Sequence, residues 1–341
     1  MGIKDLLEKI QSTNVADSKL YFVTRLLKEG VKKSAKMIDK YIFKVYQIDI
    51  DDEIRQYLYD CSQEELQRVI KKEYQLLDYD VISDDTEHLF TYKISNSKTL
   101  AFQDIVHNKL SSSPPKAQSI AGIVSDDEEL WAYCIGFNDV ENSDWIYTFR
   151  KIQPSKVAVD EEENSKTLLK TIRTLFSTTN QKLELLKGET VNLDKQIDCV
   201  YYADTFFIIK KANFEQIVGL QEEFKEQATS VVNEMKQTQM FEGLEKIDDE
   251  IEKNPSIHKK LVRIAKIGNY REITPKVIKR MEQVCKKYGN KLNVKEGKLV
   301  IEEKDDIELI LRMLADYYKT GEVTGKPYGT FAGKEIKIEG Q

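Results

Sequence analysis

The fold follows from one stretch of sequence, which reads LWAYCIGF at Leu130–Phe137, NDVENS at residues 138–143 and DWIYTFRKI at Asp144–Ile152. Both outer runs are rich in aromatic and β-branched residues, which favour strands. The polar segment between them is long enough for a turn but too short for a helical crossover. The stretch therefore predicts two antiparallel strands that are neighbours in one sheet.

Other strands and helices alternate on either side of this pair. Strands are predicted at residues 19–25, 41–48, 89–94, 183–186, 197–202 and 205–209. Helices are predicted at residues 51–59, 62–76 and 99–110 and, from apolar positions at a spacing of three to four, at 213–235. In the second of these helices Ser62 and Glu65 make a capping-box pattern, and Asn213 is the expected cap of the last. Because neighbouring strands are joined by short turns, we predict an α+β fold of two lobes, with mixed or antiparallel sheets and packed helices.

A chain of 341 residues is about the length of two domains. The acidic run Asp160–Asn164 follows Pro154 and is the expected link. We therefore predict an N-terminal α+β domain at residues 1–155 and a C-terminal α+β domain at residues 165–341, in which two basic helices lie within residues 255–289.

Composition excludes several classes of protein. No apolar run approaches the roughly 18 residues of a membrane-spanning helix, and the N-terminus carries both charge signs, unlike a secretory signal. Cys61, Cys134, Cys199 and Cys285 lie far apart and form no CxxC pair, and the chain has three histidines. This spacing excludes a recognisable zinc site. We expect buried, reduced cysteines, no metal and no cofactor, in a soluble cytoplasmic protein.

Positive charge is concentrated in one segment of an acidic chain. The net charge is −6, yet residues 255–296 hold twelve Lys and Arg against three Glu. Directly before them, Phe241–Asn254 contains six acids and two lysines. Such an asymmetry indicates a partner of opposite charge, which is either another molecule or another part of the same chain.

Two predicted helices carry most of this positive charge. The first follows Asn254, has Pro255 at its first position and ends at Gly268, and the second has Thr274 as its cap and ends at Gly289. At 100° per residue, the cations of each helix fall within an arc of about 120° on the side opposite the apolar positions. We predict that these cations form a nucleic-acid-binding face. The residues are Lys259, Lys260, Arg263, Lys266, Lys276, Lys279, Arg280 and Lys287.

Three interpretations of this face remain open. A polyanion such as nucleic acid would relieve the repulsion among cations that have few acidic neighbours on their own helix. The acidic segment Phe241–Asn254 could neutralise them within the molecule, and a solvated face without a role would need neither. If the helices meet a duplex, we expect contacts to phosphate, since the chain has no zinc-finger spacing and no RNP-type aromatic motif.

No catalytic constellation is evident. The chain lacks HExxH, GxSxG and GxGxxG motifs. Gly321–Pro327 is one residue short of a phosphate loop and is better explained as a tight turn between a helix and a terminal strand. A restriction-type nuclease would need a strand acid and an acid-x-Lys on the next strand to hold Mg²⁺. Asp198 and Lys210 come nearest, but Ile208 stands where the second acid would be. We name no catalytic residue.

Two stretches resemble a known family. The run GETVNLDKQIDCVYYADTFFIIKKANFEQIVGL, at Gly188–Leu220, places two strands before a helix that starts near Phe214. The C-terminal run TGEVTGKPYGTFAGK follows Asp316 and ends at Lys334. Together with KLYFVTR and WAYCIGF, these stretches resemble the KwaB-like family, the soluble component of the Kiwa anti-phage defence system.

The resemblance implies an intracellular bacterial protein that binds DNA and acts beside KwaA, a small integral membrane protein. We predict an anti-phage defence protein that binds DNA mainly through phosphate contacts from the basic helical face, and that such a partner recruits to the inner face of the membrane. A docking module for protein or membrane without nucleic-acid binding, or a degenerate Mg²⁺-dependent nuclease, is the alternative. The Asp316–Lys334 motif is predicted to be structural, with a ligand or partner contact as its alternative, and a homo-oligomer is left open.

Overall fold

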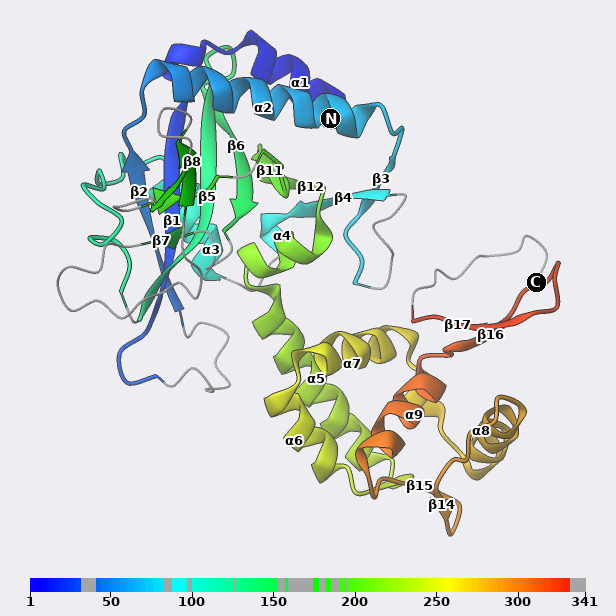
Figure 1. The fold of residues 1–341 in the computed structure, drawn as a ribbon. Helices are drawn as coiled ribbons and strands as arrows, with labels where there is room; N and C mark the ends of the chain where they lie inside the picture. The colour runs from blue at the N-terminus through cyan, green and yellow to red at the C-terminus, as the bar shows by residue number, and fades with distance from the viewer. Residues whose placement is uncertain are drawn as a thin grey trace. The chain divides into compact units, whose positions relative to one another are not determined.

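The computed structural model shows two compact units (Figure 1). It describes residues 1–31, 41–81, 88–96, 100–125, 127–152, 157–158, 174–177, 182–185, 190–193 and 195–331. The first unit is Met1–Tyr79 with Asp85–Gly219, and the second is Asp80–Asp84 with Leu220–Gln341. The α+β class is confirmed. The predicted link Asp160–Asn164 lies outside the described residues, and the domain boundaries at 155 and 165 stay a prediction.

An eight-stranded sheet, counted over the described residues, is the centre of the first unit. Its strand order is β2-β1-β5-β6-β11-β12-β4-β3. Neighbouring strands are antiparallel except β3 and β4, which are parallel. The pair that the sequence predicted is β5 with β6, in which Ile135 lies opposite Thr148. That prediction is confirmed.

The strands of one half of the sheet, from β2 to β6, are longer than those of the other half, from β11 to β3. Their bounds are β1 Lys19–Leu27, β2 Tyr41–Ile48, β3 Gln75–Asp78, β4 His88–Lys93, β5 Glu128–Asp139, β6 Asp144–Lys151, β11 Cys199–Tyr202 and β12 Thr205–Ile208. Two small antiparallel pairs accompany them, β7 Val157–Ala158 with β10 Thr190–Val191 and β8 Thr174–Ser177 with β9 Lys182–Leu185.

Helices cover both faces of the sheet because the strands alternate apolar residues to either side. Helices α1 (Ile3–Ser12) and α2 (Asp52–Ile70) share one core cluster with Phe22. The other face is aromatic, and there Phe206 meets Phe214 of α4 (Lys211–Ile217) with ring centroids 5.3 Å apart. A short helix, α3 (Leu100–Asp104), adds Phe102 to the same aromatic layer and is continued by a π-helical turn at Ile105–Lys109.

The second unit is mainly helical. Its elements are α5 Leu220–Gln237, β13 Phe241–Glu242, α6 Glu245–Lys253, α7 Pro255–Ile267, α8 Pro275–Lys287, β14 Val294–Lys295, β15 Lys298–Val300, α9 Lys304–Leu314, β16 Tyr318–Thr320 and β17 Pro327–Gly329. Helix α7 packs against α5, α6 and α9, and its Leu261 and Ile264 are fully buried in the core of this unit. Helix α8 packs against β15.

Two helix predictions were wrong in their bounds. Residues 52–70 form one helix, in which Ser62 is buried and its hydroxyl donates to the carbonyl of Leu58, so Ser62 caps nothing. The predicted helix at 213–235 is divided into α4 and α5 at Gly219, whose φ of +80° is left-handed. The N-cap of α4 is Lys210, and Asn213 lies inside the helix. Local patterns missed both points because a buried serine can bond back along its own helix, and glycine accepts left-handed backbone readily.

Candidate nucleic-acid interface

Helix α8 is built as the sequence predicts. The Thr274 hydroxyl accepts a hydrogen bond from the amide of Val277 at 3.3 Å, and Pro275 occupies the first helical position. Ile278, Met281 and Cys285 are buried along one side of the helix. These caps and this apolar side fix which residues of α8 point away from the core.

The outward side of α8 is cationic. Lys276, Lys279, Arg280 and Lys287, which the sequence predicted, are all exposed, and Lys286 is exposed beside them. In the part of the chain that the structure describes, none of these five side chains forms an ion pair with a carboxylate. The contact of Lys287 is with the ring of Tyr288, whose centroid is 5.5 Å from Nζ. The face therefore carries five positive charges that the protein leaves to solvent.

Helix α7 has the same sequence pattern but different surroundings. Lys260 pairs with Glu308 of α9 at 2.6 Å, and Lys266 pairs with Asp80 at 2.8 Å. The Nε of Arg263 donates to the carbonyl of Val81 at 3.4 Å. Because α7 lies among other helices, acids and carbonyls from elsewhere in the unit reach its cations.

The remaining predicted cation of α7 also lies against the protein. Nζ of Lys259 lies 5.9 Å from the ring centroid of Phe224 on α5. Val262, which falls on the cationic side of the helical wheel, is buried. The sharp division of α7 into apolar and cationic sides is therefore wrong, because three neighbouring helices cover more of its surface than the apolar positions indicate.

Several acids of the segment Phe241–Asn254 pair with lysines outside the two basic helices. Asp248 and Glu252 on α6 pair with Lys236 and Lys225 of α5, at 2.6 and 3.0 Å. Glu250 pairs with Lys304 at 3.0 Å. These ion pairs join α6 to α5 and to α9 within the second unit.

Asp198 is a buried structural acid in the sheet. The residue is fully buried. Its carboxylate accepts hydrogen bonds from the guanidinium of Arg150, from the backbone amide of Lys151 at 2.8 Å and from the side-chain amide of Asn213 at 2.8 Å. Burial raises the pKa of this carboxyl, while Arg150 and the two amides oppose that shift. Asp198 therefore ties β6 to the start of α4, and the backbone amides of Ile209 and Lys210 donate to its carbonyl at 2.9 Å.

Lys151 is a buried cation that the sequence analysis missed. Its Nζ lies 3.6 Å from the ring centroid of Trp131 and donates to the carbonyl of Ile152 at 2.8 Å. Burial, helped by the nearby charge of Arg25, lowers the pKa of Lys151 to about 8. No sequence signal pointed to this lysine, since a charged residue at the end of a strand is ordinarily solvated.

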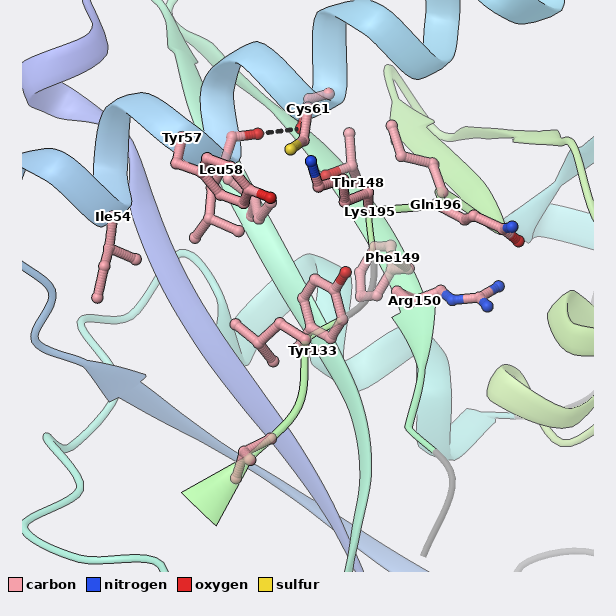
Figure 2. A pocket seen from close by; sticks show the side chains of 15 residues that line it. Ile54, Tyr57, Leu58, Cys61, Tyr133, Thr148, Phe149, Arg150, Lys195 and Gln196 are labelled. Carbon is pink, nitrogen blue, oxygen red and sulfur yellow. Dashed lines mark hydrogen bonds between the residues drawn. The ribbon is translucent and has the colours of Figure 1, made fainter. Parts of the chain in front are cut away.

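A small pocket lies between α2 and the sheet (Figure 2). Its volume is about 200 Å³, and Tyr57, Leu58 and Cys61 of α2 line it together with Tyr133 of β5 and Arg150 of β6. The guanidinium of Arg150 is engaged by Asp198, so the charge at this edge of the pocket is balanced. The pocket walls are mainly apolar and present no group with evident catalytic chemistry.

The C-terminal motif forms a hairpin. Residues 321–326 are the tip between β16 and β17, with Gly325 at φ +63°, and the amide of Gly325 donates to the carbonyl of Gly321 at 2.8 Å. The glycine-rich segment is a turn, as predicted, but it joins the strands β16 and β17 and not a helix and a strand. Tyr328 is half-exposed on β17, and Lys334 lies outside the described residues.

Other predicted features can be placed as well. All four cysteines are buried and free. In the described residues, no three His, Cys, Asp or Glu side chains gather where they could hold a metal ion. No helix in that same part of the chain is long and apolar enough to cross a membrane.

The comparisons with known proteins bear on these two units together. The family model described as Kiwa protein KwaB-like matches residues 127–324. The chain belongs to the KwaB-like family. The match covers more than half of this KwaB-like chain and includes the β5–β6 pair, Asp198 and both basic helices.

The resemblance seen in the sequence is thereby confirmed, and the family links the chain to Kiwa anti-phage defence. No curated protein and no solved structure matches this KwaB-like chain. The function of its surfaces must therefore be argued from their own geometry.

Proposed function

We propose that this KwaB-like protein acts in anti-phage defence by binding DNA through phosphate contacts from its basic helices, with α8 as the main contact. The observation that carries the proposal is the set of five exposed cations on α8 that have no carboxylate partner in the described chain. Free lysine and arginine side chains release counterions when they meet phosphate, which is the main source of sequence-independent affinity.

The two helices have different parts in this proposal. Lys260 and Lys266 on α7 must first give up Glu308 and Asp80 before they can meet phosphate. Lys276, Lys279 and Lys287 on α8 have no carboxylate partner to lose among the described residues. We therefore assign the predicted α7 residues Lys259, Lys260, Arg263 and Lys266 a supporting place at the edge of the contact.

A membrane partner completes the proposal. The KwaB-like family belongs to the Kiwa system, and the resemblance implies an integral membrane protein of the KwaA kind beside it. The protein then works in the cytoplasm, and this partner recruits it to the inner face of the membrane. The cationic face of α8 would remain available to DNA if the docking surface lies elsewhere on the protein.

The test removes three charges from α8 and compares them with three charges from elsewhere. The test variant is K279Q/R280Q/K287Q, and the matched control is K4Q/K71Q/K93Q, whose three lysines are exposed on the first unit. Both change the net charge equally. Binding of a fluorescent duplex DNA is measured by anisotropy between about 50 and 200 mM salt.

The two variants should behave differently. The slope of log K against log salt is negative, and each lost phosphate contact reduces its magnitude by about 0.9. The slope of the α8 variant should therefore be shallower by about 2.7, and its affinity should be at least about tenfold lower. The control should bind as the wild type does. The free energy of unfolding, measured by thermal denaturation, should change by less than about 0.5 kcal/mol in either variant, because the replaced side chains are exposed.

Two results would contradict the proposal. Equal losses in both variants would mean that net charge alone attracts DNA. No binding of DNA by the wild type, together with binding to anionic vesicles or to the membrane partner that the α8 variant loses, would establish the docking-module alternative.

A further inference from the structure

Helix α8 lies in the chain between helix α7 and a β-hairpin that packs against it. Helix α7, a 3₁₀ turn at Asn269–Glu272 and helix α8 follow one another, and the hairpin of β14 and β15 comes directly after α8. The hairpin is joined by β13 into a sheet of order β13-β15-β14, counted over the described residues. Helix α8 packs against β15 of this hairpin, which supports the core-facing side of the helix and leaves the opposite side outward.

We infer that α8 lies in the major groove of B-form duplex DNA, an inference that rests on the DNA binding proposed above. A helix with its side chains is about 10–12 Å across, and the major groove of B-form DNA is about 12 Å wide. The side of α8 that carries Ile278, Met281 and Cys285 is held in the core of the unit. The opposite side is therefore presented to the groove as a rigid row.

Gln283 occupies the middle of this row. Lys279 and Arg280 precede it by four and three residues, and Lys286 and Lys287 follow it by three and four. Residues at these spacings are neighbours on one helix face, so cations lie one turn to either side of the amide. Cations at both ends of the row suit the two phosphate backbones that border the groove, and the glutamine amide can pair with N6 and N7 of an adenine.

The row is the wrong kind of surface for other nucleic acids. It contains five cations and one amide beside the exposed carboxylate of Glu282, but no aromatic side chain on which an unpaired base could stack. Double-stranded RNA has a deep, narrow major groove that side chains cannot read. Both points favour duplex DNA.

The hairpins support the same geometry. The ring of Tyr288, at the end of α8, stacks on Tyr318 of β16 with centroids 4.5 Å apart, and its hydroxyl donates to the carbonyl of Lys319 at 3.2 Å. Lys291, between α8 and β14, and Lys326, at the tip of the β16–β17 hairpin, are exposed. Each gives a cation beyond the end of α8 for a phosphate outside the groove.

The experiment compares three probes and uses chemical modification of the groove. The full chain is titrated with a duplex DNA, a duplex RNA of the same sequence and an oligothymidylate. We expect the duplex DNA to bind at least about tenfold more tightly than either other probe. In methylation interference, methyl groups on guanine N7 in the major groove should weaken binding, and methyl groups on adenine N3 in the minor groove should not.

A variant pair tests the role of Gln283. Q283A should leave the salt slope unchanged and should reduce the preference for sites that contain adenine by about threefold or more. The control Q237A, at an exposed glutamine on α5, should change neither the salt slope nor this preference. Equal binding of all three probes, or interference from adenine N3 alone, would overturn the major-groove inference while DNA binding still stands. Failure of every probe to bind would overturn the proposed function itself.

Discussion

Helices α7 and α8 are alike in sequence and different in what their charges can do. Each has thirteen residues, a proline at its first position, an N-cap that accepts a backbone hydrogen bond and a glycine close after its last residue. On α7, Lys260 and Lys266 are paired with Glu308 and Asp80. On α8, no cation of the outward row has a carboxylate partner in the described residues.

A cationic sequence pattern therefore predicts where positive charge lies but not whether that charge is free to bind another molecule. Helix α7 packs against three other helices, one of which carries Glu308, and Asp80 reaches the helix from the segment that follows β3. Helix α8 is held along one side, so its other side keeps its charge for an outside partner. Solvent-exposed pairs contribute no more than about 1 kcal/mol each, so pairing on α7 changes accessibility to phosphate more than it changes stability.

The largest expected effect concerns a third environment, in which a cation has neither solvent nor a paired carboxylate. Lys151 is buried against Trp131 and its pKa is lowered to about 8 by burial and by Arg25. Between pH 8 and the ordinary value of 10.5 the unfolded chain holds a proton that the folded chain has released. The free energy of unfolding should therefore rise with pH across this window, and below about pH 8 the full cost of burying the charge is present.

The variant K151M removes that pH dependence. Relative to the variant, the wild type should gain on the order of 1–3 kcal/mol between pH 8 and 10.5, measured by urea unfolding at several pH values. K93M, at an exposed lysine on β4, should follow the wild-type profile. A wild-type profile parallel to that of K151M would show that Lys151 is solvated and that burial does not set its state.

The next prediction gives α8 the kind of neutralisation that α7 has. The substitution Q283E places an acid at the centre of the row, where Lys279 and Lys287 lie four residues away on either side. Intrahelical pairs should stabilise the helix by about 0.2–0.5 kcal/mol each. The acid also repels phosphate, so affinity for duplex DNA should fall by about tenfold.

The measurement is anisotropy at fixed salt together with thermal unfolding. The neutral variant Q283A serves as the control, because it removes the amide without adding charge. If Q283E binds DNA within about twofold of Q283A, the α8 row is not the contact surface, and the contrast between the two helices has no consequence for binding.

The smallest effect is expected from the reverse change on α7. The substitution D80N keeps the shape of the side chain but removes the carboxylate beside Lys266, whose side chain is 54% exposed. Because Lys266 is then free to meet a phosphate, D80N should bind DNA about two- to threefold more tightly than the wild type. Its slope of log K against log salt should be steeper by about 0.9. D5N, at another exposed acid, makes the same change in net charge. An equal gain in D5N would assign the effect to net charge.

Much of the framework could be predicted from local sequence. The β5 and β6 strands, the caps Asn254 and Thr274 and the ends of the basic helices depend on neighbours in the chain, so their patterns are visible there. The site could be predicted only in part. Lys286 and Gln283 fall on the same arc as the predicted residues of α8, and a complete helical wheel would have included them.

Other features depend on residues far away in the chain. The sequence places Asp198 on a strand, where a nuclease would hold a metal ligand, but Arg150 and Asn213 fill its hydrogen-bonding positions. Val262 lies on the cationic side of its wheel and is buried because several helices enclose α7. A wheel describes one helix in isolation, so it carries no information about what covers that helix.

Local sequence was sufficient to place the β5–β6 pair, the ends of the two basic helices and the segment in which positive charge accumulates, because these follow from residue spacing and from caps within a few residues. Only the tertiary structure decided which of those charges remain free. Pairing depends on acids that packing brings within about 4 Å. Asp80 lies 186 residues before its partner Lys266, and Glu308 lies 48 residues after its partner Lys260. Among the described residues, no carboxylate forms an ion pair with the cations of the outward row of α8.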